Sequence, residues 1–221
     1  MHSKVSKQSG FTLVEIAIVL VIIGLLLGGV LKGQEMITSA KVKNLAGDQD
    51  GVVAAFTSYQ DRYKALPGDD ANVVALARFG VNDCGGVACA VAAPANTLGN
   101  GLINGAYNSI VDTDESRVLW QQLRAAGFLK KEGGSMFAPP LNAMGTATGV
   151  DSQGRYGWVG GAAQHVMVNI PAKEAQALDI MVDDGFTNLG SLRTVAPTAA
   201  GQVGVPYAVG TGTLYTPVRK M

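Results

Sequence analysis

Residues 10–31 read GFTLVEIAIVLVIIGLLLGGVL, and the rest of the chain is arranged around this stretch. From Phe11 to Leu31 the only ionisable side chain is that of Glu15. As a helix rising about 1.5 Å per residue, the stretch is about 30 Å long, which matches the hydrocarbon core of a bilayer. A carboxylate at the centre of such a helix costs about 2.5–3.5 kcal/mol, and less near an interface. The sequence therefore predicts a membrane-spanning helix in which Glu15 is functional and needs a partner.

The ten residues before the apolar run, MHSKVSKQSG, are polar and basic. The lysines at positions 4 and 7 favour a cytoplasmic N-terminus. A secretory signal would place a small-residue cleavage site after the apolar run, but here the small residue, Gly10, comes before it. A plain membrane anchor with a glutamate near the interface is the alternative, and it leaves Gly10 unexplained.

The string from Gly10 to Glu15, at a basic N-terminus and opening an apolar run, resembles the class III signal of the type IV filament prepilin family. This family comprises type IV pilins, minor pilins and type II secretion pseudopilins. The resemblance is specific over residues 4–45. It implies that a prepilin peptidase cuts between Gly10 and Phe11, that the new amine of Phe11 is methylated, and that Phe11 and Glu15 take part in filament assembly.

The chemistry of the string agrees with this assignment. Cleavage creates a charged amine at Phe11, and pairing with Glu15 of a neighbouring subunit offsets the cost of a carboxylate in apolar surroundings. The pair also sets the axial register, because a misplaced subunit leaves a buried charge unpaired. The resemblance implies as partners the homo- or hetero-oligomeric filament subunits, the prepilin peptidase, the inner membrane, and an assembly ATPase with its inner-membrane platform. The 17 basic and 17 acidic residues balance, so nothing indicates nucleic acid.

A second periodic stretch follows the apolar run. Its apolar positions are 45, 52, 56, 59, 63 and 66, a spacing typical of one helical face, and Pro67-Gly68 should end the helix. The predicted organisation is a leader peptide (1–10), a transmembrane or filament-core half of the long helix (11–31), an amphipathic second half (32–66), and a periplasmic or extracellular globular pilin-like domain (67–221).

The remainder of the chain predicts short elements joined by long loops. Helices are expected at 70–79, 112–128 and 172–182, strands at 156–158, 165–170, 191–195, 203–209 and 214–218, and loops at 80–108 and 133–154. The predicted fold class is α+β, a long N-terminal helix packed against a small antiparallel β-sheet with extra short helices.

The two cysteines, Cys84 and Cys89, are too few to hold zinc. In an exported domain they would form a local disulfide, and free thiols are the alternative.

Three acidic groups are candidate calcium ligands, since calcium sites use oxygen ligands. They are Asp69 and Asp70; Asp112, Asp114 and Glu115; and Asp179, Asp183 and Asp184. None has EF-hand spacing, and the alternative for each is a turn or a helix end. No cofactor is required, and calcium at Asp179, Asp183 and Asp184 is kept as a hypothesis.

Catalytic motifs are missing from the sequence. After Gly10 the chain has one histidine, His165, within an apolar strand pattern, and it contains neither G-x-S-x-G nor a phosphate-binding G-x-x-x-x-G-K-[ST] motif. The prediction is that the protein is not an enzyme.

The expected function is that of a structural subunit of a bacterial type IV filament. The chain would first sit in the inner membrane as a single-pass protein and then move into a periplasmic or extracellular filament. Three alternatives stay open: a type II secretion pseudopilin, a low-copy minor pilin or adhesin acting as a binding module, and a membrane-anchored enzyme, which the missing motifs disfavour. Many major pilins have a proline where this chain has Lys32.

Overall fold

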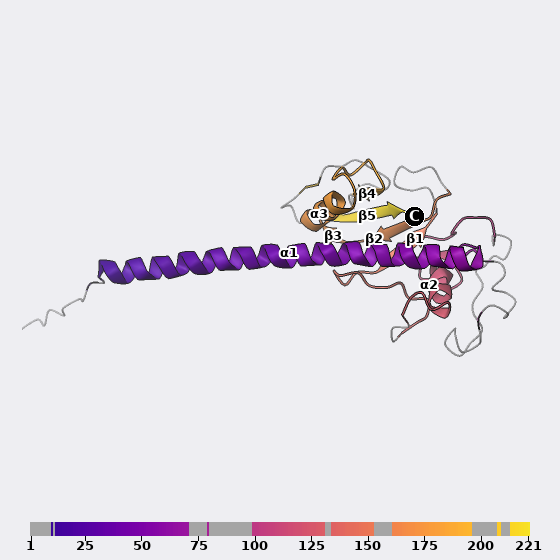
Figure 1. Ribbon diagram of the computed structural model, residues 1–221, viewed down its shortest axis with the longest axis horizontal. Helices are drawn as coiled ribbons and strands as arrows, with labels where there is room; N and C mark the ends of the chain where they lie inside the picture. The colour runs from indigo at the N-terminus through magenta and orange to yellow at the C-terminus, as the bar shows by residue number, and fades with distance from the viewer. Residues whose placement is uncertain are drawn as a thin grey trace, which may run out of the picture. The chain divides into compact units, whose positions relative to one another are not determined.

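The computed structural model describes residues 10, 12–70, 79, 99–130, 134–152, 161–195, 207–208 and 213–221 (Figure 1). The architecture is α+β, as predicted. Its elements are α1 (Leu13–Tyr63), α2 (Glu115–Ala125), β1 (Thr148–Asp151), β2 (Gln164–Met167), β3 (Ile170–Pro171), α3 (Ala172–Val182), β4 (Leu192–Val195) and β5 (Leu214–Lys220). The chain divides into two compact units, Met1–Ala40 and Lys41–Met221.

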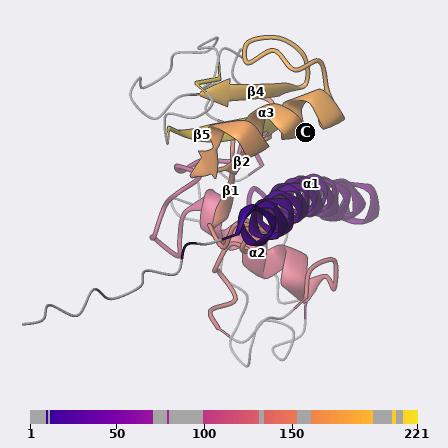
Figure 2. The same cartoon turned by 90° about the vertical axis from the view of Figure 1, so that its left-hand side faces the viewer.

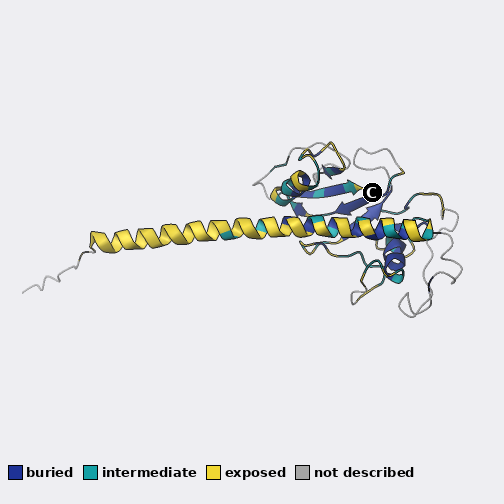
Figure 3. Cartoon of the chain, in the orientation of Figure 1, coloured by how far each residue is buried: buried dark blue, intermediate teal, exposed yellow. Residues whose placement is uncertain are grey.

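Helix α1 changes character along its length (Figure 3). Every large hydrophobic side chain from Leu13 to Leu31 is exposed. Beyond Ala40 one face is buried, and its members are Val42, Leu45, Gln49, Val52, Ala55, Phe56 and Tyr59. The amphipathic periodicity predicted for this second half is therefore confirmed. The helix ends at Tyr63 because Lys64 adopts a left-handed φ of 55°.

Strand β5, the last element of the chain, is the centre of the sheet. It pairs antiparallel with β2, β3 and β4, while β1 pairs antiparallel with β2. Val218 of β5 is opposite Val166 of β2 and also opposite Arg193 of β4, so β2 and β4 flank β5 on opposite sides. The small antiparallel sheet predicted from the sequence is thus present.

The second half of α1 contributes to two of the three apolar clusters formed by the described residues of the Lys41–Met221 unit. In one cluster Val52, Phe56 and Tyr59 pack with Leu119 and Trp120 of α2. The other cluster joins α1 to the sheet and α3, and it consists of Val42, Leu45, Met167, Ile170, Ala172, Ala175, Leu178, Leu192 and Tyr215. The second half of α1 accordingly lies between the sheet and α2 (Figures 1 and 2).

The short helices match their predicted positions. Helix α3 begins after Pro171, as expected, and α2 occupies the central part of the predicted 112–128 segment. Gly127 follows α2 with a φ of 80°, and the N–H of Phe128 returns to the carbonyl of Leu123, which closes the helix.

Two predictions about the sheet were wrong. The segment 133–154, expected to be a loop, contains β1. Within β1, position 149 requires glycine, since a Cβ would collide with the carbonyl oxygen of Tyr107. The single strand expected at 165–170 is two, β2 and β3, because Asn169 has a φ of 58° and interrupts the pairing. The strand expected at 156–158, most of the strand expected at 203–209 and nearly all of the helix expected at 70–79 lie outside the described residues; residues 207–208 are described and belong to no strand.

Candidate functional site

The first turn of α1 forms a closed hydrogen-bond unit around Glu15. The backbone N–H and the hydroxyl of Thr12 each donate to Glu15 Oε2, both at 2.8 Å. In return, the N–H of Glu15 donates to Thr12 Oγ1 at 3.3 Å. This is a capping box, in which Thr12 and Glu15 satisfy backbone groups that a helix N-terminus leaves free. The sequence reasoning missed it, although the spacing T-x-x-E is readable.

The surroundings of this turn are open. Gly10 is exposed, and an added Cβ there would meet no atom within 4 Å. An added Cβ would likewise meet no atom within 4 Å at Gly24, Gly28, Gly29 or Gly33 along the helix. With its large apolar side chains exposed, this half of α1 presents a surface that suits lipid or other apolar helices. It is a helix long and apolar enough to cross a membrane.

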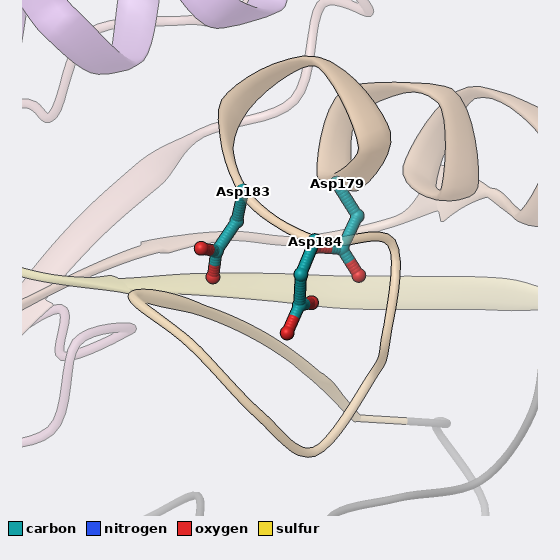
Figure 4. Close-up of side chains that lie close together, drawn as sticks. All are labelled: Asp179, Asp183 and Asp184. Carbon is teal, nitrogen blue, oxygen red and sulfur yellow. The ribbon is translucent and has the colours of Figure 1, made fainter.

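A second candidate site lies where α3 ends (Figure 4). Asp179 is in the last turn of α3, Asp183 follows the final residue of the helix, and Asp184 begins the loop towards β4. One carboxylate oxygen from each of the three lies within 4.8 Å of the others. The structure thus brings together the three aspartates that the sequence analysis proposed as calcium ligands. Asp179 is buried, Asp183 half-buried and Asp184 exposed.

Asp179 is the member with the most constrained surroundings. Its Oδ2 accepts a hydrogen bond of 2.7 Å from the Tyr207 hydroxyl, which lies 2.7 Å from Thr194 Oγ1. Its Oδ1 is buried without a hydrogen-bond partner. Burial raises the pKa of Asp179 to about 6, the hydrogen bonds from Tyr207 and from the backbone N–H of Gly185 oppose this, and the charges of Asp184 and Asp183 raise the pKa further. Burial likewise raises the pKa of Tyr207.

The other two aspartates hold the loop that follows α3. Asp183 Oδ2 accepts the N–H of Leu192 at 3.0 Å, and Asp184 Oδ1 accepts the N–H of Phe186 at 2.9 Å. Gly190 has a φ of 70°, and a Cβ there would collide with the Asp183 carboxylate. In the loop from Asp183 to Gly190, the two aspartates therefore bind backbone N–H groups, and Gly190 leaves room for the Asp183 carboxylate.

The remaining acidic groups have structural partners. Asp69 accepts the backbone N–H groups of residues 99, 100 and 101, and Asp70 accepts the Tyr59 hydroxyl. Asp112 pairs with Arg117 at 2.9 Å. Within the described residues, only Asp179, Asp183 and Asp184 bring three acidic side chains close enough together to hold a metal ion.

His165 is buried in β2, and neither ring nitrogen has a hydrogen-bond partner among the described residues. Burial, together with the positive charge of Arg219, lowers its pKa to about 3, so the ring is neutral at physiological pH. This enclosed position favours a structural role for His165.

Phe11, Cys84 and Cys89 lie outside the described residues. Methylation at Phe11 and the disulfide between the two cysteines therefore stay predictions.

The comparisons with known proteins bear on the N-terminus. A family model described as the prokaryotic N-terminal methylation motif matches residues 5–31. This motif is the signature of type IV prepilin-like proteins, so the predicted resemblance is confirmed. No curated protein and no solved structure matches the chain. The motif supports a type IV prepilin-like protein, and the apolar half of α1 is consistent with membrane anchoring before assembly.

Proposed function

We propose that this chain is a structural subunit of a type IV filament. A prepilin peptidase cuts it between Gly10 and Phe11, the new terminal amine is methylated, and the first half of α1 holds the chain in the inner membrane until assembly. The observation that carries the proposal is the match to the methylation motif over residues 5–31, which leads into a helix whose large side chains from Leu13 to Leu31 are all exposed. Such a surface needs lipid before assembly and neighbouring helices afterwards.

The capping box suggests how Glu15 is tolerated in the membrane before a partner arrives. In the single chain its carboxylate accepts two hydrogen bonds from Thr12 and lies at the positive end of α1. Both interactions lower the cost of the charge near an apolar region. During assembly the amine of Phe11 on a neighbouring subunit becomes the counter-charge.

Two substitutions of Glu15 separate helix capping from charge pairing. Glutamine can keep the capping box, because an amide oxygen also accepts from Thr12, but it carries no charge. Alanine removes both. If assembly depends on the ion pair, E15Q and E15A should both remain in the membrane fraction and both yield at least tenfold less sheared filament than the wild type. Filament yield at the wild-type level from E15Q would contradict charge pairing.

Processing has its own test. Intact-mass measurement of assembled subunits should give a chain that begins at Phe11 and carries one additional methyl group. Retention of residues 1–10 in assembled protein would contradict the proposal.

The finer roles differ in filament length and copy number. Long extracellular fibres containing this subunit in bulk would identify a pilus subunit, whereas short periplasmic filaments would identify a type II secretion pseudopilin. A few copies per filament would identify a minor pilin or adhesin. Electron microscopy with subunit counting by quantitative mass spectrometry distinguishes the three.

A further inference from the structure

We propose that Asp179, Asp183 and Asp184 bind one Ca²⁺ ion where α3 ends. This inference goes beyond the proposed function and does not depend on it, because the residues belong to the Lys41–Met221 unit and are remote in sequence from the methylation motif.

The spacing of the oxygens suits calcium. One oxygen from each carboxylate lies within 4.8 Å of the other two (Figure 4). Calcium binds oxygen at about 2.3–2.6 Å, so two ligands of one ion are at most about 5 Å apart. Calcium also accepts six to eight oxygens in irregular arrangements, which leaves positions for water beside the exposed Asp184.

The unsatisfied oxygen of Asp179 is the second observation, and it is independent of the clustering. Asp179 is wholly buried, yet its Oδ1 has no hydrogen-bond partner. A buried carboxylate oxygen without a donor is costly, and natural structures satisfy such atoms with a donor, a water molecule or an ion. Tyr207 occupies only Oδ2, so Oδ1 is available to a cation.

The local charge also favours a cation. Among the described residues, no lysine or arginine forms a salt bridge with any of the three aspartates. The C-terminal end of α3 adds a negative partial charge at the same place. A divalent ion would balance this concentration of negative charge.

The test uses the full chain in detergent micelles, stripped with EDTA and dialysed. Thermal unfolding is followed by tryptophan fluorescence while CaCl₂ is raised to about 10 mM, a range suited to extracellular sites with Kd near 1 mM. The expected result is a rise in Tm of about 3–6 °C. Isothermal titration with CaCl₂ should show one site per chain.

The main variant is D184N. Its side chain is exposed, and asparagine keeps an oxygen to accept the N–H of Phe186, so the loop should fold as before. D184N should retain the Tm of the stripped wild type and lose most of the calcium-dependent rise. The matched control is D61N, which removes an exposed carboxylate from α1 and should keep the full rise.

Three results would overturn the proposal: no heat of calcium binding together with an unchanged Tm, an equal rise in Tm with MgCl₂, or an undiminished rise in D184N. D179N should also lose the rise; if it fails to fold, D184N and the wild-type titration still decide.

Discussion

Replacing Leu45 by alanine tests whether the second half of α1 is a core element of the Lys41–Met221 unit. Leu45 is fully buried, in a cluster that includes Met167 and Ile170 from the sheet and Leu178 from α3. Truncation leaves a cavity among side chains from three elements, which cannot all move inward to fill it. The effect should therefore appear in the stability of the whole unit.

The expected size follows from this burial. A buried leucine replaced by alanine costs about 2–5 kcal/mol. In a domain of this size, 1 kcal/mol corresponds to about 2–4 °C in Tm. L45A should thus lower Tm by about 4–20 °C.

The matched control is I37A, eight residues earlier on the same helix. Ile37 is 59% exposed, so its truncation creates no cavity, and alanine is the better helix former. I37A should change the free energy of unfolding by less than about 0.5 kcal/mol.

The assay is thermal unfolding of the full chain in detergent, followed by near-UV circular dichroism, which reports the packing around the buried Trp120. The reasoning is refuted if L45A unfolds within 1 °C of the wild type, or if I37A lowers Tm as much as L45A does. Either outcome would mean that α1 does not change from exposed to buried near Ala40.

Two further predictions concern pH and backbone. The unfolded chain binds a proton at His165 below about pH 6.5 and the folded chain only near pH 3, so this residue should lower the free energy of unfolding as pH falls from 6.5 towards 3. The variant H165Q should therefore show a shallower decline in Tm over this range. A decline as steep as that of the wild type would exclude His165 as the cause. G68A places a Cβ 2.5 Å from the carbonyl oxygen of Glu115 at a φ of 92°, and it should lower the free energy of unfolding, measured with denaturant, by more than about 2 kcal/mol. The control G101A, at a φ of 80° in open space, should lower it by about 1–2 kcal/mol. Equal losses in the two variants would show that the collision is unimportant.

Local patterns in the sequence predicted the helices well. The spacing of apolar residues that includes Leu45 and Phe56 is typical of one helical face, and Pro171 predicts the start of α3. Each pattern lies within or directly beside the helix that it predicts. Strand β1 was missed because the need for Gly149 comes from Tyr107, more than forty residues earlier in the chain. A contact over that distance leaves no trace in the local pattern.

In the candidate sites, too, features formed by neighbouring residues were predictable, whereas contacts between distant residues were not. The string from Gly10 to Glu15 is contiguous, so the sequence was enough to propose its role. The grouping of Asp179 with Asp183 follows from their separation of four residues, which is one helical turn. The hydroxyl of Tyr207 on Asp179 and the unsatisfied Oδ1 became visible only in the folded chain, because 28 residues separate Asp179 from Tyr207.

The position of β5 sets an order of events in the making of this protein. Among the described residues, β2, β3 and β4 all take β5 as a pairing partner, and β5 follows all three in the sequence. Strands β3 and β4 therefore wait for their partner until residues 214–220 have been synthesised. Under the proposed function, which requires export, the sheet can close only after these residues have crossed the membrane. A nonsense codon at position 214 would remove β5 and leave three strands without the partner that joins them.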